Sequence, residues 1–488
     1  MTLIFSGHDY KYELESVLKL FIPASRFSFV YSGEEFKLSG DFCYLRRREG
    51  KYTILLYAYC SYAGKKALRL TRISKDKLPT DGGEMLLSKL LFKALSSLTG
   101  ISPEWGVITG VRPVKRVNEM LAVGATRDEV KKRLSDEFFV SDQKAEIAVM
   151  TAENQAHALQ DMPKRAFSLY VSIPFCPTRC AYCSFVSQSV EASLPLLDAY
   201  LENLLKEIEY TARMTKRLNL TLDTVYIGGG TPTVLSPDAL YRLMDKIHSS
   251  FDTKNVREFT VEAGRADTVT AEKLRVIKQM GVNRVSVNPQ TLSDDVLKAI
   301  GRKHTVEEFY SAFDLARKAG FSVINTDIIA GLPKDDLNSF KHTIDGLVAL
   351  SPENITVHTL SVKRASNLNL SGEREVFKNP AGEMVKYANE KLISVGYAPY
   401  YLYRQKNMVE NLENIGWQKG NTPSLYNIYI MEEVQSIIAL GAGASTKLVD
   451  QEGGRLERIF NYKHALEYNK HFDLMLRKKD EIERFYNA

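Results

Sequence analysis

The 488-residue chain has little of what marks an exported or membrane-spanning protein. Its N-terminus, MTLIFSGHDY, carries no basic leader followed by an apolar core, and no run approaches the roughly 18 apolar residues that a membrane span takes. It contains only 5 cysteines, an odd number, and three of them fall within one short stretch. Such a set does not build the disulfide framework of a secreted domain. These absences predict a cytoplasmic protein without a membrane span.

The chain also lacks a strong excess of charge of one sign. The net charge of +6 is small for 488 residues and is spread over clusters of mixed sign. We interpret the densest basic stretch, residues 65–77, as the solvent-facing side of a hairpin rather than as a binding patch. No nucleic-acid partner is expected from this pattern. Internal repeats and low-complexity segments are absent as well.

A chain of this length exceeds one simple core, so several domains are expected. Residues 1–100 predict an α+β domain without catalytic signals. Helical periodicity covers Tyr10–Phe21 and Gly83–Leu98, and strand-like runs cover Phe36–Arg48 and Lys51–Ile73.

Residues 101–163 predict a helical connector, with a helix at Ser141–Leu159 and a linker at Asp161–Lys164. Cys43 and Cys60 lie in the strand-like runs of the first domain. We expect them to be buried apolar residues rather than metal ligands.

From residue 164 to 380 the pattern changes to alternating strands and helices, which implies parallel βαβ units. Six such units are fewer than the eight that close a barrel, so we predict an α/β fold built on a partial, open (β/α)6 barrel. In such folds the loops at the carboxyl ends of the strands carry the chemistry. Residues 381–488 predict a C-terminal α+β or helical domain that caps the barrel and its substrate. The strand candidates are Phe167–Ile173, Thr224–Ile227, Glu258–Glu262, Arg284–Val287, Ser322–Ile329 and Asn354–Thr359.

The stretch YVSIPFCPTRCAYCSF, residues 170–185, places Cys176, Cys180 and Cys183 in a C-x3-C-x2-C spacing. Three thiolates this close together can hold a metal cluster, and a four-iron cube with three protein ligands keeps one iron open for chemistry. Structural zinc usually takes four ligands, and no fourth Cys or His lies nearby. A C-x2-C redox pair would leave Cys176 unexplained.

This stretch resembles the radical SAM superfamily, and within it the members related to oxygen-independent coproporphyrinogen III oxidases. The resemblance implies a [4Fe–4S] cluster on the three cysteines and one or two molecules of S-adenosylmethionine (SAM). Tyr182 matches the aromatic residue that packs on the adenine in that family. Tyr170 opens the matching run and is assigned to the same cofactor site.

The run GGGTP, residues 228–232, directly follows a strand candidate. Gly and Pro are common in ordinary turns, but consecutive glycines also let a ligand approach the backbone closely. In the resembled family this motif binds the amino group of SAM, and Gly229, Gly230 and Thr231 match it.

Glu262 ends the third strand candidate, and the family has a Glu here. Such a carboxylate can cap a helix or pair with a base, and it can also accept hydrogen bonds from the ribose of a ligand. The run from Arg284 to Gln290 resembles a strand-plus-glutamine motif in which the family has Gly in place of Asn288. Because Asn tolerates left-handed backbone best after Gly, we expect the turn to survive at Asn288 and Gln290 to bind the ligand.

Arg302 lies at the position that contacts a ligand carboxylate in the family. A bidentate guanidinium suits a methionine carboxylate or a propionate, and the alternative is a surface cation at a helix end. Asp327 lies within an otherwise apolar strand, where a carboxylate is costly unless it is paired. The resemblance places Asp327 around a second SAM molecule. No role is assigned to His358.

The resemblance implies an enzyme of porphyrin and haem biosynthesis. Cleavage of SAM to a 5′-deoxyadenosyl radical would start the oxidative decarboxylation of coproporphyrinogen III to protoporphyrinogen IX. An unidentified reductant, such as flavodoxin or ferredoxin, would supply the electron. The runs Trp105–Gly106 and Thr109–Pro113 resemble the subgroup of coproporphyrinogen dehydrogenases of the HemZ type.

An alternative on the same scaffold is a haem-binding chaperone or transfer protein, or a haem-modifying radical SAM enzyme. Established decarboxylases carry a fourth cysteine where this chain has Phe185, and the haem-binding relatives carry Phe there. Those chaperones also have a His-Asn-x-x-Tyr-Trp haem motif. The aligned stretch here runs from Glu413 to Gln418 and lacks the histidine.

Overall fold

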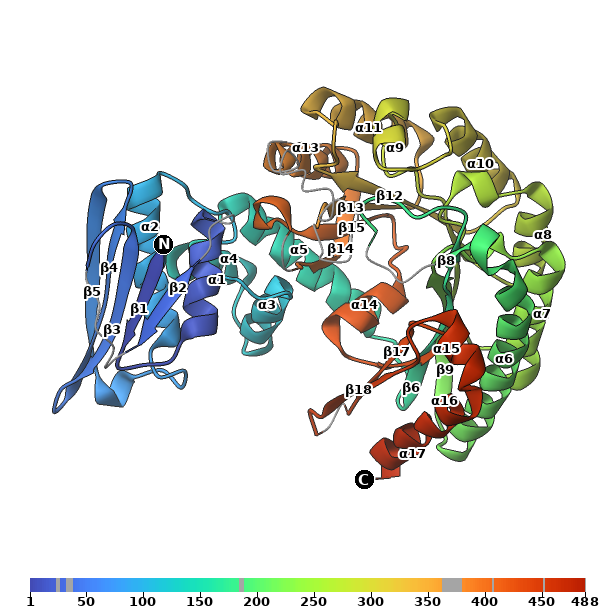
Figure 1. The fold of residues 1–488 in the computed structure, drawn as a ribbon, viewed down its shortest axis with the longest axis horizontal. Helices are drawn as coiled ribbons and strands as arrows, with labels where there is room; N and C mark the ends of the chain where they lie inside the picture. The colour runs from blue at the N-terminus through green and yellow to red at the C-terminus, as the bar shows by residue number, and fades with distance from the viewer. Residues whose placement is uncertain are drawn as a thin grey trace. The chain divides into compact units, whose positions relative to one another are not determined.

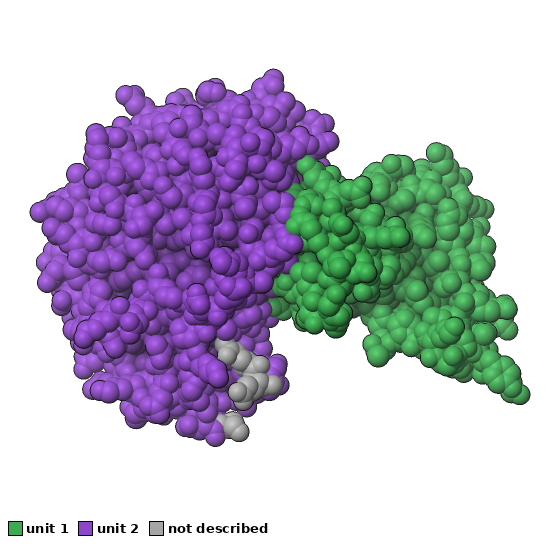
Figure 2. Space-filling view, turned by 180° about the vertical axis from the view of Figure 1, so that it is seen from behind, with its two compact units in different colours: residues 1–149 green, residues 150–488 purple. Residues whose placement is uncertain are grey.

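The computed structural model describes residues 1–22, 27–31, 38–183, 188–361, 380–405, 408–450 and 453–487, without the side chains of 188–194. Its contacts divide the chain into two compact units, Met1–Val149 and Met150–Ala488 (Figure 2). The boundary lies within helix α5 (Asp142–Leu159). The finer division at residues 100, 163 and 380 stays a prediction.

Unit 1 is an α+β unit with one five-stranded sheet in the order β2-β1-β3-β4-β5. Alternate residues of β4 face the helices: Ile54, Leu56 and Ala58 are buried, whereas Tyr52 lies before the strand and is 70% exposed. Its elements are β1 (Thr2–Ser6), α1 (Lys11–Phe21), β2 (Ser28–Tyr31), β3 (Phe42–Glu49), β4 (Thr53–Tyr62), β5 (Lys65–Ser74), α2 (Glu84–Thr99), α3 (Pro113–Ala122) and α4 (Arg127–Phe138).

Two expectations for unit 1 are confirmed. Cys43 and Cys60 lie directly opposite each other on β3 and β4, and both are fully buried. The basic stretch forms β5, which pairs with β4 as a hairpin and keeps alternate side chains in solvent. The long strand-like run Lys51–Ile73 is therefore two strands, which turn at Ala63 and Gly64, both with positive φ.

Unit 2 contains the predicted partial barrel, and all six parallel strands are present (Figure 1). Their apolar residues point both outward to the helices and inward, as expected for a parallel sheet covered by crossover helices. The strands are β6 (Ala166–Ile173), β9 (Thr221–Gly229), β10 (Glu258–Glu262), β11 (Arg284–Ser286), β12 (Val323–Ala330) and β13 (Asn354–Thr359).

The crossover helices lie along the outside of this arc of strands (Figure 1). Most begin at a residue whose side chain accepts a backbone N–H, such as Ser236 before α7 and Thr305 before α10. They are α6 (Val190–Arg217), α7 (Pro237–Ser250), α8 (Ala271–Gln279), α9 (Asp294–Ala299), α10 (Val306–Lys318) and α11 (Leu337–Leu350).

The C-terminal residues extend the same sheet at both edges instead of forming a layer apart from it. β15 pairs antiparallel with β13, and β16 pairs parallel with β6, so the barrel stays open within an 11-stranded sheet. Residues 456–460 form a strand, and helices follow from residue 465 to residue 487. The elements are α13 (Ala381–Ser394), β14 (Tyr397–Tyr403), β15 (Asn414–Lys419), α14 (Leu425–Glu432), β16 (Ser436–Leu440), β17 (Ser445–Val449), β18 (Leu456–Phe460), α15 (Ala465–Lys470), α16 (Phe472–Lys478) and α17 (Asp480–Asn487).

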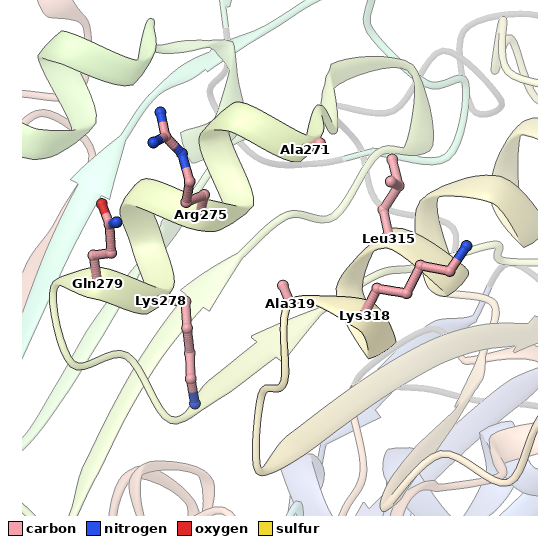
Figure 3. Close-up of a pocket in the computed structure, with 7 residues that line it drawn as sticks. All are labelled: Ala271, Arg275, Lys278, Gln279, Leu315, Lys318 and Ala319. Carbon is pink, nitrogen blue, oxygen red and sulfur yellow. The ribbon is translucent and has the colours of Figure 1, made fainter.

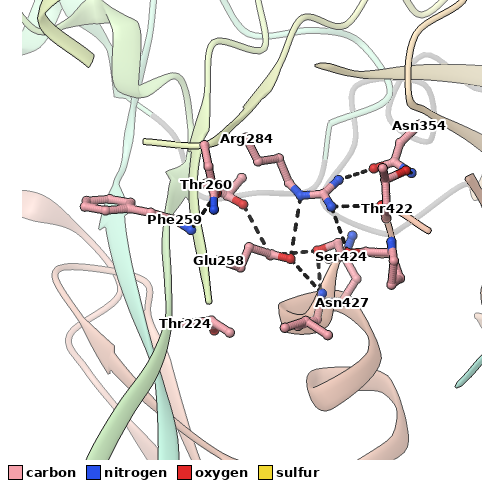
Figure 4. Close-up of polar contacts among 12 residues, drawn as sticks. Thr224, Glu258, Phe259, Thr260, Arg284, Asn354, Thr422, Ser424 and Asn427 are labelled. Atoms are coloured by element: carbon pink, nitrogen blue, oxygen red, sulfur yellow. Dashed lines mark hydrogen bonds and ion pairs between the residues drawn. The ribbon is translucent and has the colours of Figure 1, made fainter. Parts of the chain in front are cut away.

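A buried polar cluster holds the amino ends of the barrel strands (Figure 4). The Arg284 guanidinium donates to the carbonyls of Thr422 (2.9 Å) and Pro423 (2.8 Å), and its Nε lies 3.6 Å from Glu258 Oε2. Glu258 accepts from the Leu425 N–H at 2.7 Å. These contacts tie the start of α14 to β10 and β11, at the end of the strands opposite to the cysteines.

Across the part of the chain that the structure describes, no helix has the length and apolar character needed to cross a bilayer.

Candidate functional site

The three cysteines lie on the segment that follows β6, at the carboxyl end of the strand. Cys176 belongs to the short strand β7 (Phe175–Cys176), which pairs with β8 (Gln188–Ser189). The N–H of Cys183 donates to the carbonyl of Cys180 at 3.1 Å, which makes a tight turn. Cys180 is buried, and Cys176 and Cys183 are half-buried. The segment thus gathers three thiols with partial access to ligands.

Neighbouring loops fix this segment in place. After β9, the N–H of Thr231 donates to the carbonyl of Phe175 (2.8 Å), and Thr231 Oγ1 lies 3.5 Å from Cys176 Sγ. After α9, the carbonyl of Ile300 accepts the N–H of Ala181 at 2.9 Å. Loops from different βα units therefore hold the cysteine segment, as expected for a site at the carboxyl ends of parallel strands.

Cys180 lies beside two arginines, Arg265 and Arg302. Nη1 of Arg265 is 3.9 Å from Cys180 Sγ. Burial lowers the pKa of Arg302, but Tyr182 and Cys180 beside it raise that pKa above its usual value. Burial also raises the pKa of the Tyr182 phenol. This surrounding positive charge suits a sulfur that binds metal as the thiolate.

Two of the glycines in the GGGTP run are required by packing. Gly229 has a φ of +109°, and a Cβ there would lie 2.9 Å from Ser172 Oγ. A Cβ at Gly230 would lie 2.5 Å from the carbonyl oxygen of Phe175. The end of β9 thus approaches the segment that leads to the cysteines too closely for a side chain. Binding of SAM by Gly229, Gly230 and Thr231 stays a prediction.

Glu262 is a half-buried carboxylate at the end of β10. Tyr226 donates to its Oε1 at 2.5 Å. Burial raises the pKa of Glu262 to about 7, and the charge of Asp327 adds to this rise. The Tyr226 ring stacks on Tyr426 at 4.4 Å between centroids and on Tyr170 at 6.2 Å. Tyr170 therefore contributes to an aromatic stack next to Glu262.

Asp327 lies within β12 and is paired with polar side chains from this strand and its neighbours, as the cost of burying a carboxylate predicts. Its oxygens accept hydrogen bonds from Asn325 (2.8 Å) and Asn288 (2.9 Å), and His358 Nε2 lies 3.9 Å away. Burial raises the pKa of Asp327, but His358 and Asn325, together with Thr356, lower it below its usual value. Asp327 is therefore ionised at neutral pH.

The expected left-handed turn at Asn288 is wrong, because the residue with positive φ is Gln290, at 70°. Asn288 instead accepts the N–H of Asp327 at 3.1 Å and donates to the Asp327 carboxylate. The Gln290 N–H donates to the Asp327 carbonyl and its carbonyl accepts from Ile329, both at 3.0 Å. These bonds hold Gln290 in a conformation that costs a non-glycine residue free energy.

Arg302 is buried, so it is not the surface cation that the alternative interpretation predicted. Its Nη1 donates to the carbonyls of Asn288 (2.8 Å) and Gly264 (3.3 Å), and the residue is 8% exposed. His304 nearby is 2% exposed, and burial together with Arg302 lowers its pKa to about 4, so it is neutral at pH 7.

Contacts thus join the sequence-predicted residues into one connected set at the carboxyl ends of the strands. Sequence reasoning did not single out Arg265, His304, Tyr226 and Asn325, since no spacing marks them. The connected set comprises Tyr170, Cys176, Cys180, Tyr182, Cys183, Gly229, Gly230, Thr231, Glu262, Gln290, Arg302 and Asp327. Phe185 lies outside the described residues.

The donor set fits a [4Fe–4S] cluster. Among the described side chains, no three Cys, His, Asp or Glu groups converge as the ligands of a metal ion would. A four-iron cluster needs no such convergence, because each cysteine sulfur binds a different iron. The chain places three sulfurs on one tight loop, one for each of three irons, and two guanidinium groups lie beside one of these sulfurs.

Two cavities of the structure lie elsewhere. One of about 290 Å³ lies between α8 and α10 (Figure 3). Its lining includes Arg275, Lys278 and Lys318, which extend from the two outer helices. A second, also of about 290 Å³, lies at the amino ends of the strands and includes Arg257 and Arg284. Neither is lined by a sequence-predicted site residue.

Comparisons with known proteins find several relatives of this chain. The sequence pattern of the radical SAM superfamily matches residues 170–347. The oxygen-independent coproporphyrinogen-III oxidase-like protein HemZ of Bacillus subtilis is 38% identical over 394 residues, which are 79% of this chain and 78% of the relative. The heme chaperone HemW of the same organism is 40% identical over 197 residues, which are 40% of this chain and 51% of that relative.

Among solved structures, the coproporphyrinogen III oxidase HemN of Escherichia coli, a radical SAM enzyme, is similar with a TM-score of 0.51. The match has 22% sequence identity and covers 67% of this chain and 73% of that chain. At this identity the likeness shows the fold alone.

Proposed function

The chain belongs to the oxygen-independent coproporphyrinogen III oxidase-like family of the radical SAM superfamily, and from this premise we propose that it decarboxylates coproporphyrinogen III oxidatively to protoporphyrinogen IX. Members of this superfamily bind a [4Fe–4S] cluster and SAM. When bound, these groups would supply an electron and a 5′-deoxyadenosyl radical that removes a hydrogen atom from a propionate. The resulting substrate radical would lose carbon dioxide and pass one electron to a one-electron acceptor, which leaves a vinyl group.

Cys176, Cys180 and Cys183 would hold the cluster. Their loop keeps two sulfurs half-buried, so that SAM can reach the metal while bulk water is largely excluded. Thr231 Oγ1, 3.5 Å from Cys176 Sγ, would support one of these ligands with a hydrogen bond.

The chain's own residues would position SAM around this loop. Thr231 and the glycines before it would take the amino group, and Glu262 would accept from the ribose hydroxyls. Tyr182 would pack on the adenine, and Arg302 would face a carboxylate, from methionine or a substrate propionate. Gln290 and Asp327 would contact the same SAM molecule or a second one.

The observation that favours an enzyme over a haem carrier is the burial of the stretch aligned with the haem motif. Glu413 is 1% exposed and Trp417 is fully buried. Asn414 accepts the Thr359 N–H through its side chain at 2.8 Å, which ties β15 to β13. The stretch therefore forms part of the sheet, and it carries Glu where the chaperones carry a ligating histidine.

The test is anaerobic reconstitution followed by two assays. We expect the wild-type chain to bind about four irons and to cleave SAM to 5′-deoxyadenosine under dithionite. With a one-electron acceptor added, it should convert coproporphyrinogen III to vinyl products detected by mass spectrometry. Cys180→Ala should lose cleavage, and Cys60→Ala, which removes a buried thiol of unit 1, should retain it. A chain that cleaves SAM but leaves coproporphyrinogen III unchanged overturns the substrate assignment.

A second candidate is a haem carrier, favoured by the 40% identity to the heme chaperone HemW over 197 residues. It predicts stable, stoichiometric haem binding with no loss of carbon dioxide from coproporphyrinogen III. An electron donor such as flavodoxin or ferredoxin is part of the first proposal, and dithionite replaces it in the assays above.

A further inference from the structure

Arg265 is a buried arginine whose guanidinium lies beside one of the three cysteine sulfurs. It directly follows β10 and the Gly264 turn, and it is 3% exposed. Its Nη1 lies 3.9 Å from Cys180 Sγ and also donates to Thr178 Oγ1 (2.9 Å) and to the Thr178 carbonyl (3.2 Å). One edge of the guanidinium therefore faces the cysteine segment.

The opposite edge of the Arg265 guanidinium forms a bidentate ion pair with Asp267. Arg265 Nε donates to Asp267 Oδ1 at 3.0 Å and Nη2 donates to Oδ2 at 2.7 Å. The carboxylate thus lies on the side of the guanidinium away from the sulfur. This planar, two-point contact fixes the direction of the remaining N–H groups, which a lysine could not do.

The Asp267 pair and the two bonds to Thr178 fix the guanidinium, and in that position its Nη1 lies 3.9 Å from Cys180 Sγ. An arginine that only capped the loop after β10 could satisfy its Nη1 in solvent, whereas this one is buried against a cluster ligand. Arg302 also lies beside Cys180 and hydrogen-bonds it, while its Nη1 donates to the carbonyls of Asn288 and Gly264. Arg265 is the arginine that contacts both Cys180 and Thr178 of the cysteine segment.

Reduction adds one negative charge at the cysteine site. A fixed N–H donor and positive charge beside a cluster sulfur stabilise the more negative state more than the less negative one. The buried surroundings strengthen this effect, because water screens it poorly.

We propose that Arg265 is a positioning residue that raises the reduction potential of the cluster by donating a charged hydrogen bond to Cys180 Sγ, with Asp267 holding the guanidinium in that direction. The inference rests on the proposed function only in requiring a cluster on the three cysteines.

The experiment is an EPR-monitored potentiometric titration of the reconstituted full-length chain without SAM. Arg265→Met should keep the iron content and shift the midpoint to more negative values. At the potential that half-reduces the wild type, we expect the ratio of reduced to oxidised cluster to fall about tenfold, which corresponds to about 59 mV for one electron. Arg265→Lys should shift less than Arg265→Met, since it keeps the charge. Arg275→Met, on the exposed side of α8, is the matched control and should leave the midpoint unchanged.

The remaining outcomes each decide the proposal. An unchanged midpoint in Arg265→Met with full iron content rejects it. If Arg265→Met binds no iron, Arg265→Lys and Asp267→Asn decide: unshifted midpoints in both reject the proposal, and negative shifts support it. Weaker SAM binding without a shifted midpoint would make Arg265 a SAM ligand and also rejects it. A wild-type chain that binds no cluster contradicts the proposed function instead, so the two failures are distinguishable.

Discussion

Glu262 places a titratable group inside the predicted SAM site. Its carboxylate accepts from Tyr226, and burial raises its pKa to about 7. At neutral pH it is therefore divided between the charged and the protonated form. Ribose hydroxyls donate hydrogen bonds, and these favour the charged carboxylate. Binding of SAM is thus linked to release of a proton from Glu262.

We therefore expect SAM to bind more weakly as the pH falls through 7. The group must lose its proton to accept from the ribose, so affinity should drop by up to about tenfold per pH unit below the pKa and level off above it. Isothermal titration calorimetry of the reconstituted chain between pH 6 and 8.5 measures this. Glu262→Gln should bind with a lower, pH-independent affinity. Equal pH slopes in the wild type and the variant would assign the linkage to another group.

Single residues also show which features of the site the sequence can predict and which it cannot. The spacing of the cysteines and the GGGTP run predicts which residues meet, because each follows a strand whose carboxyl end lies at the same edge of the sheet. The conformation of Asn288 and Gln290 was not predictable, because it depends on hydrogen bonds to Asp327 from the next strand. Arg265 was overlooked for the same reason: its proposed role depends on a contact with Cys180, which is far away in the sequence.

At the scale of helices and strands, α14 is linked to the barrel through a buried ion pair between β10 and β11. Arg284 and Glu258 have side chains only 6% and 4% exposed, and they bind the residues that start α14. Removing one partner leaves the other charge buried without compensation, which costs more than the intact pair contributes.

Arg284→Met should therefore lower the free energy of unfolding by about 3–5 kcal/mol, measured by urea denaturation. The double variant Glu258→Gln/Arg284→Met should recover part of that loss. Arg213→Met, which breaks an exposed pair with Glu209 on α6, is the control and should change stability by less than about 0.5 kcal/mol. A loss in the double variant as large as in the single one would show that Arg284 acts through packing instead of charge.

The strands of the barrel were predictable because apolar runs alternate with amphipathic helices at regular intervals. Several bounds agree to within a residue or two, including β10 and β13. β15 and β16 were not predicted. Their residues are buried almost throughout, so they lack the alternation that marks a strand with one face in solvent. Their place at the edges of the barrel depends on pairing with β13 and β6, which no local pattern contains.

At the scale of the whole molecule, a fully buried pair joins the C-terminal helices to the strand before the cysteines. Lys479 Nζ lies 3.0 Å from Glu207 of α6, and both side chains are 0% exposed. Glu207 also accepts the Gly441 N–H at 2.8 Å. The next residue, Ala442, accepts from Ser172 Oγ at 2.8 Å, on β6.

Lys479→Met should leave the buried Glu207 carboxylate without its positive partner, and we expect a loss of about 3–5 kcal/mol in the free energy of unfolding. Because Gly441 and Ser172 are linked to this pair, iron content after reconstitution should fall as well. Arg477→Met, at an exposed neighbouring residue, is the control for both measurements. Full iron content in a destabilised Lys479→Met would separate the pair from the cysteine site.

The pairing of β6 with β16 also dictates an order of events during synthesis. Phe167 pairs with Ser436 and Val171 with Leu440, so one side of β6, the strand that precedes the cysteines, keeps its backbone N–H and C=O groups unpaired until residues 436–440 have been synthesised. An unpaired strand edge of this kind is open to pairing with other chains. We therefore expect a cluster on the three cysteines to reach its final surroundings only after residue 440 has left the ribosome.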